Sequence, residues 1–350
     1  MNKIWWWIGA IVVAVVAWWF LVNYQTPEVA TNRPVKIGII TDLSGPAAYW
    51  GESTRIGANI AVAELVAEGI PVELVFEDYA LDAAKAASAA QKLISIDGVD
   101  ALYAEFNPGA IAVASVAKDK PVLYLFDAAV ESPLEGNENA FKTYLDYRAG
   151  CRAIAEQFKS EGVATVGMLK VGLEFGELCL QGVREVYANP VVEGYTLGDT
   201  DFRTQLTKLK SAKVGAVINV GFEGDTANTL KGMKDLGIKV PYGTVDDTIT
   251  DVVKAEYADE LKGAASFGFP TVDLAFAAKL LAANNNTKLA TDYGAALAYT
   301  HVIQIAHAIA ECVDTACVAR EMSSASADNT IGFKGFINRI ADLDLQIKSY

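Results

Sequence analysis

The chain has 350 residues, enough for about two domains, and 52% of them are hydrophobic. Its formal net charge of -14 argues against nucleic acid as a partner, because phosphate binding needs clustered lysine and arginine. The same acidity does not favour docking on an anionic lipid surface.

The N-terminus carries an uncharged apolar run, IWWWIGAIVVAVVAWWFLV, at residues 4–22. As a helix it would be about 28 Å long, close to the thickness of a bilayer's hydrocarbon core. Tryptophans near both ends fit the two membrane interfaces, and Lys3 predicts a cytoplasmic N-terminus with the binding domain outside. No small residues suited to signal cleavage follow the run. Residues 1–24 are therefore predicted to be a retained transmembrane anchor, with a cleaved signal peptide as the alternative, and residues 25–34 a linker.

Apolar runs and alanine-rich helical stretches alternate along the chain after the linker. The runs are almost continuously apolar, as expected for parallel strands covered by helices on both faces. Strands are predicted at residues 36–41, 72–76, 101–104, 122–126, 165–170, 191–195 and 216–220. Helices are predicted between them at residues 53–68, 83–96, 110–118, 148–160, 176–187, 202–211 and 226–236. One sheet would need too many strands, so we expect two α/β units in series, the second beginning near residue 165.

Aromatic and polar side chains follow several of these predicted strands. In open parallel sheets the ligand crevice lies beyond the carboxyl ends of the strands, so these residues are the candidates for binding. The set suits an amphipathic small molecule, cationic ones included. The candidate ligand-binding residues are Trp50, Asn107, Asp127, Ala128, Phe175, Phe222, Glu223 and Asp246.

Each of the more distinctive candidates also has a purely structural alternative. Trp50 could be a packing residue, and Phe175 and Phe222 could belong to the core. Asn107 stands before a proline and could cap a helix. Asp246 could be an ordinary turn residue.

The four cysteines fit an oxidising compartment. Cys312 and Cys317 are close in sequence with a possible turn between them, which predicts a local disulfide. Cys151 and Cys179 could form a second disulfide if their helices are neighbours. A metal site is not predicted, because the spacing is not C-x-x-C and no histidine is close enough to complete a tetrahedral set.

No motif for catalysis or cofactor binding is present. The chain lacks a nucleophile elbow, a phosphate-binding loop, a zinc-protease motif and a dinucleotide-binding glycine pattern. Its two histidines, His301 and His307, are six apart on a predicted helix and do not share a face at the i, i+4 spacing. The chain is therefore expected not to be an enzyme and to need no cofactor; a cleft hydrolase acting on an amide is the minority alternative.

Five segments, taken in order, resemble the type I periplasmic substrate-binding proteins of ABC transporters. The likeness is greatest to the branched-chain amino acid (Leu/Ile/Val) binding group. It is carried by KIGIITDLSGPAAYWGESTRIGANIAVAEL, VELVFEDYALDAAKAASAAQKLI, GVDALYAEFNPGAIAVASVAKDKPVLYLFDAA, DFRTQLTKLKSAKVGAVINVGFEGD and DYGAALAYTHVIQIAHAI. The Ser-Gly-Pro turn and the acidic pair at residues 77–78, four residues before Asp82, are its more specific elements.

The resemblance implies two doubly wound α/β lobes with parallel sheets, joined by three crossovers, with the ligand enclosed between them. It places lobe 1 at residues 35–147 plus 263–330 and lobe 2 at residues 148–262 plus 331–350. The family's ligand contacts fall on Trp50, on Asn107 for a carboxylate, near Ala128 for an amino group, and on Phe175 and Phe222. The acid that pairs with an ammonium group falls on Asp246 or one residue away.

The sequence departs from the family's carboxylate-binding pattern. The loop usually rich in serine and threonine reads Glu-Phe-Asn-Pro-Gly here, and Val130 replaces an expected hydroxyl. Acids at the strand ends, such as Glu105 and Glu223, would make the cleft acidic. The expected ligand is therefore a small polar molecule: an amino acid, an amide or a related amine.

The expected function is capture of this ligand outside the cytoplasm and delivery to the permease of an ABC importer. The anchor would hold the binding domain at the cell membrane near that permease. The alternative is a sensory ligand-binding receptor subunit that reports to a signalling partner.

Overall fold

The computed structural model describes residues 33–350, apart from residues 46, 197, 270, 290 and 329. The anchor predicted for residues 1–24, and most of the linker at residues 25–34, lie outside the described residues. In the described part of the chain, none of the helices combines the length and the apolarity that crossing a bilayer requires.

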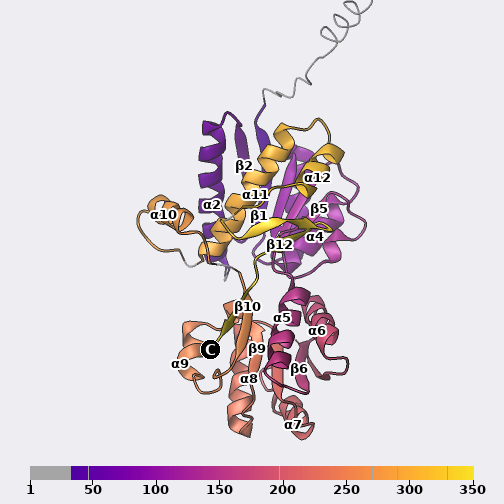
Figure 1. Cartoon of the computed structure of the whole chain (residues 1–350). Coiled ribbons are helices and arrows are strands. Elements are labelled where there is room, and N and C mark those ends of the chain that lie inside the picture. The colour runs from indigo at the N-terminus through magenta and orange to yellow at the C-terminus, as the bar shows by residue number, and fades with distance from the viewer. Residues whose placement is uncertain (1–32, 46, 197, 270, 290, 329) are drawn as a thin grey trace, which may run out of the picture.

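The described chain forms two α/β lobes, one above the other (Figure 1). Lobe 1 is built on a seven-stranded sheet with the strand order β11-β12-β5-β4-β3-β1-β2, in which only β11 is antiparallel to its neighbour. Its elements are β1 (Val35–Thr41), α2 (Ala48–Ala67), β2 (Val72–Asp78), α3 (Ala83–Lys92), η1 (Leu93–Asp97), β3 (Ala101–Glu105), α4 (Asn107–Ala117), β4 (Leu123–Asp127), η2 (Ser132–Leu134), β5 (Ala140–Lys142), α10 (Leu274–Ala283), α11 (Asp292–Ala310), α12 (Thr315–Ser323), β11 (Phe333–Ile337) and β12 (Ile340–Leu343).

Lobe 2 is built on a six-stranded sheet with the order β13-β10-β9-β8-β6-β7, in which the last strand of the chain, β13, is antiparallel to β10. Its elements are α5 (Tyr147–Ser160), β6 (Val166–Val171), α6 (Glu174–Val186), β7 (Val191–Tyr195), α7 (Arg203–Ser211), β8 (Ala216–Val220), α8 (Glu223–Leu236), β9 (Tyr242–Val245), η3 (Asp246–Thr248), α9 (Asp251–Glu256), β10 (Ala265–Gly268) and β13 (Gln346–Ser349).

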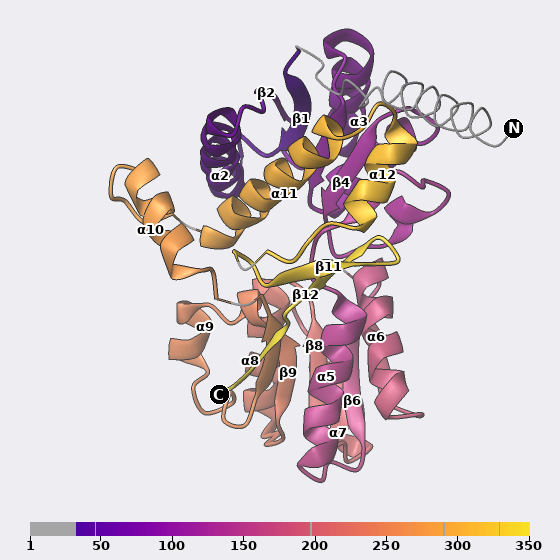
Figure 2. The same cartoon turned by 45° about the horizontal axis from the view of Figure 1, so that its top comes forward.

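Both sheets are covered by helices on both faces, which explains the continuous apolar strands of the sequence. In lobe 1, Ile37 and Ile39 of β1 pack with α2, α11 and α12, whereas Ile40 packs with α3 and α4 on the opposite face. Figure 2 shows α2, α11 and α12 together on one side of this lobe. The alternation follows from the two-residue period of a strand, which sends successive side chains to opposite faces. The expected doubly wound architecture is confirmed.

The chain passes between the lobes three times, at residues 143–146, 269–273 and 344–345. The lobe boundaries expected from the sequence differ from this pairing at two segments. Strands β11 and β12 belong to the lobe 1 sheet, although residues 331–350 were expected in lobe 2. Strand β10 belongs to the lobe 2 sheet, although residues 263–330 were expected in lobe 1. Pairing partners far away in sequence decide both assignments.

Both expected disulfides are present. Cys151–Cys179 joins the neighbouring helices α5 and α6, and Cys312–Cys317 closes the short connection into α12. Glu321 lies close to the second pair, but disulfide sulfurs are not thiolate ligands, so this group is not a metal site.

Candidate ligand-binding cleft

The lobe 1 side of the cleft is built over two buried carboxyl groups at the ends of adjacent strands. Glu105 ends β3 and is paired in register with Asp127, which ends β4. Glu105 is wholly buried and accepts hydrogen bonds from the hydroxyls of Thr54 (2.5 Å) and Tyr103 (2.9 Å), and also from Thr41. No cation pairs with it among the described residues, and burial raises the pKa of Glu105 above its ordinary value.

Asp127 shares the Tyr103 hydroxyl with Glu105, so one phenolic proton faces two carboxyl groups. The Thr143 hydroxyl likewise contacts both the Phe126 carbonyl (3.0 Å) and Asp127 (2.5 Å). The single Thr143 proton can satisfy one of these contacts, and a protonated Asp127 would satisfy the other by donating to Thr143. Burial raises the pKa of Asp127 well above its usual range, and it lowers the pKa of the neighbouring His301 to about 3, so that this histidine is neutral. Asp127 was a candidate ligand contact, but its side chain lies beneath the cleft.

Trp50 lies in the first turn of α2, which begins five residues earlier than the expected start at residue 53. Its indole nitrogen donates to Glu105 (3.1 Å), and its ring lies 5.5 Å from that of Phe106. Helix α11 packs against the indole at Gly294. A Cβ atom added at Gly294 would lie only 3.1 Å from the ring. Trp50 is half-buried, whereas the adjacent Tyr49 is 53% exposed. Trp50 therefore has both a packed face and a free face.

Asn107 is the first residue of α4, and its side-chain oxygen accepts from the backbone N–H of Ala129 (2.9 Å). This bond ties the end of β3 to the loop after β4. Ala128, beside it in that loop, is buried. The side chain of Asn107 thus holds together two strand ends on the floor of the cleft.

The next residues of the same loop contact lobe 2. The carboxylate of Glu174, at the start of α6, accepts from the backbone N–H groups of Glu131 (2.6 Å) and Ser132 (2.9 Å) and from the Ser132 hydroxyl (2.7 Å). These three bonds join the lobes directly. Sequence reasoning missed Glu174, although its position directly after β6 was a signal.

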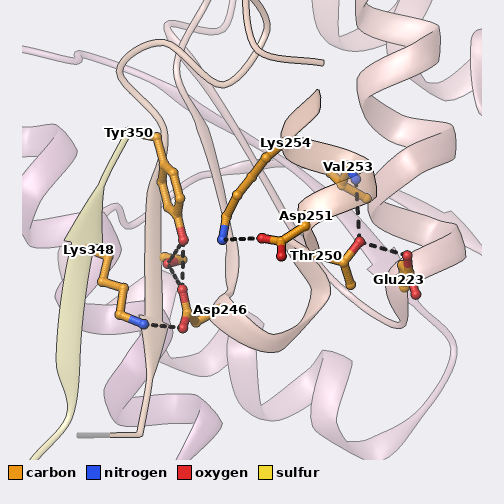
Figure 3. A network of polar contacts seen from close by, with 9 residues as sticks. Glu223, Asp246, Thr250, Asp251, Val253, Lys254, Lys348 and Tyr350 are labelled. Carbon is orange, nitrogen blue, oxygen red and sulfur yellow. Dashed lines mark hydrogen bonds and ion pairs between the residues drawn. The ribbon is translucent and has the colours of Figure 1, made fainter. Parts of the chain in front are cut away.

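The lobe 2 side of the cleft carries an aromatic pair. Phe175 is buried, while Phe222 is 53% exposed and meets it edge-on at 6.0 Å between ring centroids. Glu223, next to Phe222, is exposed and accepts from the Thr250 hydroxyl (2.8 Å), as Figure 3 shows.

Asp246 is fully engaged inside lobe 2. It forms an ion pair with Lys348 and accepts from the hydroxyls of Tyr350 (2.7 Å) and Ser266 (3.0 Å). In Figure 3, Lys348 and Tyr350 reach Asp246 from the C-terminal strand. Burial opposes ionisation of Asp246, but the bonds from Lys348 and Tyr350 outweigh it, and the pKa of Asp246 lies below its ordinary value.

Asp247, the next residue, has a different environment. Its side chain is exposed, and among the described residues it has no ion-pair partner. Partial loss of solvent, together with the nearby Asp246, raises the pKa of Asp247 to about 6. Partial burial, followed by the negative charges of Asp247 and Glu223 in lobe 2, raises the pKa of Tyr49 in lobe 1, so these groups are near enough to interact electrostatically between the lobes.

Two open surface pockets elsewhere on the molecule are distinct from this cleft. One, of about 720 Å³, lies beside α11 and α12 on the outside of lobe 1. The other, of about 320 Å³, lies between α5 and the β11–β12 hairpin. Neither contains a residue from the ends of β1, β3, β4 or β9.

Comparison with known proteins gives a family match over almost the whole described chain. The sequence pattern of the Periplasmic binding protein family matches residues 34–344. The Leu/Ile/Val-binding protein of Escherichia coli strain K12 is 26% identical over 228 residues, covering 61% of this chain and 62% of that protein. A leucine-, isoleucine-, valine-, threonine- and alanine-binding protein of Pseudomonas aeruginosa is 27% identical over 238 residues, covering 62% and 63%. These alignments span slightly less than two thirds of the relatives' length.

Solved structures share the fold. A solute binding protein of an ABC transporter from R. palustris, in complex with 4-hydroxybenzoate, superposes with a TM-score of 0.76 at 20% identity, covering 91% of this chain and 93% of that chain. A branched-chain amino acid transporter substrate binding protein from Streptococcus pneumoniae, in complex with isoleucine, gives 0.72 at 21% identity, covering 91% and 96%. At such identities the likeness extends to the fold and not to the ligand.

Proposed function

Because this chain belongs to the periplasmic binding protein family, we propose that it captures a small polar solute between its lobes and delivers it to the permease of an ABC importer. The family implies a location outside the cytoplasm. The named relatives bind amino acids, and the proposed ligand is an amino acid, an amide or a related amine. The ligand is carried and not chemically changed.

The observation that carries this proposal is the approach of groups from both lobes across one cleft. Glu174 of lobe 2 bonds directly to Glu131 and Ser132 of lobe 1, and the chain passes between the lobes three times. The charges of Asp247 and Glu223 in lobe 2 also act on Tyr49 in lobe 1. A ligand held between these groups would stabilise the closed arrangement of the lobes. In proteins that close by a hinge, a partner can then recognise the closed conformation.

The residues predicted from the sequence take distinct parts in this proposal. The free face of Trp50 and the exposed Phe222 cover the apolar part of the ligand. Asp247 supplies the negative charge first assigned to Asp246, whose oxygens Lys348 and Tyr350 occupy. Glu223 adds charge at the rim. Asn107, Asp127 and Ala128 form or support the floor of the cleft at the ends of β3 and β4. Phe175 packs against Phe222.

The apolar run at residues 4–22 is proposed to anchor the binding domain in the cell membrane. Anchoring would raise the effective concentration of the binder at the permease. We expect the full chain to sediment with membranes, and a variant lacking residues 1–24 to be released in folded form. Native protein that begins after residue 24 would instead mean that the run is a cleaved signal.

The binding proposal is tested by thermal-shift screening of the purified full chain against amino acids, amides, amines and short peptides. A true ligand raises the melting temperature through linkage. Replacing Trp50 by Ala should then weaken that ligand by about 1–3 kcal/mol in titration calorimetry. Unchanged affinity together with lower stability would make Trp50 a packing residue only.

A further inference from the structure

The charged groups of the cleft are unbalanced. Asp247 presents an exposed carboxylate that, among the described residues, has no cationic partner. Lys348 is the lysine nearest in the lobe 2 network, and it is already paired with Asp246. Lys142, near the first crossing, is wholly buried, and its nearest carboxylate is that of Glu131 at 3.9 Å. Neither of these two lysines therefore offers a free positive charge beside Asp247.

Several hydrogen-bond donors in the loop after β4 of lobe 1 are already occupied. The N–H of Ala129 donates to Asn107, and the N–H groups of Glu131 and Ser132 donate to Glu174. The Ser132 hydroxyl donates to Glu174 as well. Pro108, in the first turn of α4, has no N–H to offer. The Glu174 carboxylate thus takes donors that this loop could otherwise offer to the carboxylate of a ligand.

We infer that the ligand of this cleft is a small organic cation that carries no free carboxylate group, with Asp247 as its charge partner. The inference rests on the proposed solute-binding function and narrows its ligand class. An amino acid would bring its carboxylate to a loop whose N–H groups at Ala129, Glu131 and Ser132 are occupied, close to the strand ends that carry the buried acids Glu105 and Asp127. An amine, or an amino acid whose carboxylate is converted to an amide, has no carboxylate that needs these occupied donors or that lies close to the buried acids.

The exposed aromatic groups suit the same ligand class. Tyr49 of lobe 1 and Phe222 of lobe 2 are each 53% exposed. The charges of Asp247 and Glu223 act on Tyr49, and Glu223 follows Phe222 in the sequence. Aromatic faces attract ammonium groups, and their rings also cover the apolar body of a ligand. A cation between Tyr49 and Asp247 would meet a ring on one side and a carboxylate on the other.

The test compares probes that differ only in their charged ends, using the full chain at neutral pH and titration calorimetry. The first set is leucine, leucinamide, 3-methylbutylamine and 4-methylpentanoate. The second is the corresponding set built on phenylalanine. We expect the amine and the amide to bind about tenfold or more tightly than the amino acid, and the carboxylate alone not to bind, since a charge-assisted bond is worth at least one factor of ten.

Two variants locate the charge. Asp247→Asn should weaken amine binding about tenfold or more. Asp251→Asn is the matched control, because Asp251 is an exposed acid of the same segment that pairs with Lys254, as Figure 3 shows. It should bind amines as the parent does. Equal loss in both variants, or no loss in Asp247→Asn, would overturn the role of Asp247.

The remaining outcomes separate the ligand class from the function. Tighter binding of the amino acid or of the carboxylate would overturn the inference and leave solute binding intact. Binding of a neutral amide or sugar, with no amine bound, would do the same. If no amine, amino acid, amide or sugar shifts the melting temperature or releases heat, both the inference and the proposed function fail.

Discussion

Both lobes carry acids at the carboxyl ends of their strands, but the surroundings of these acids differ between the lobes. In lobe 1, Glu105 and Asp127 end adjacent strands and are withdrawn from water among hydroxyl groups, without a cation. In lobe 2, Asp246 and Asp247 follow β9; the first is neutralised by Lys348 and the second faces the cleft. A carboxyl group at a strand end is therefore not by itself a ligand contact. Its partners decide whether it supports the floor or presents a charge.

The largest effect should come from removing the acceptor beneath Trp50. Glu105→Leu leaves the hydroxyls of Thr41 and Thr54 and the indole N–H of Trp50 without their acceptor, and unsatisfied buried donors are costly. We expect the free energy of unfolding to fall by about 3 kcal/mol or more in urea denaturation. Glu105→Gln keeps an accepting oxygen and should lose much less. Equal losses in the two variants would show that charge, and not hydrogen bonding, is the function of this group.

Replacing Asp by Asn at the end of β4 (Asp127) and just after β9 (Asp246) should distinguish a neutral acid from an ionised one. Asp246→Asn removes the charge that holds Lys348 and should cost about 1.5–3 kcal/mol of unfolding free energy. Asp127→Asn keeps one donor and one acceptor, as a protonated carboxyl does, and should cost about 1 kcal/mol or less. Denaturation at neutral pH measures both, and a larger loss at Asp127 would reverse the comparison.

Contact between the lobes should depend on Glu174. Glu174→Gln weakens the bonds to Glu131 and Ser132, and should shift the empty protein toward an open arrangement by about tenfold in population. Distance measurement between spin labels at the exposed Ser88 and Ser211, one in each lobe, would detect the change.

The control for this variant is Glu177→Gln. Glu177 lies in the same turn of α6 but pairs with Lys170 of its own lobe (2.8 Å). Glu177→Gln should leave the distribution of distances between the two spin labels unchanged. A shift of equal size in both variants would assign the effect to α6 as a whole and not to the contact between lobes.

The smallest effect concerns the pH dependence of stability at Asp247. Its pKa is raised to about 6, with Asp246, Tyr49 and Glu223 as its neighbours in the cleft. The ionised form is thus less favourable in the folded protein than in the unfolded chain. This penalty is absent below the ordinary pKa of 3.8 and complete above the raised pKa. Asp247→Asn should therefore exceed the parent in stability above that range, by about 1 kcal/mol after allowance for solvent screening.

Melting temperatures of the two proteins across the acid-to-neutral range provide the measurement. The gap between Asp247→Asn and the parent should close on acidification. A gap that widens on acidification would mean that the Asp247 carboxylate is stabilised in the folded protein.

The sequence alone determined the architecture, because that information is local. Continuous apolar strands alternating with helices required parallel sheets covered on both faces, and the ends of those strands marked the cleft. Trp50, Asn107 and Phe222 became candidate ligand-binding residues in this way. The short spacing of Cys312 and Cys317 likewise predicted their disulfide.

Only the tertiary structure decided which of these side chains are free. Asp246 and Asp247 are indistinguishable in sequence, and the difference between them comes from Lys348 and Tyr350, about a hundred residues away. Asp127 becomes a buried group because the sheet order sets it beside Glu105. Strands β11 and β12 join lobe 1 through pairing with β5. Burial and charge pairing depend on such long-range contacts, whereas periodicity reports only on neighbours along the chain.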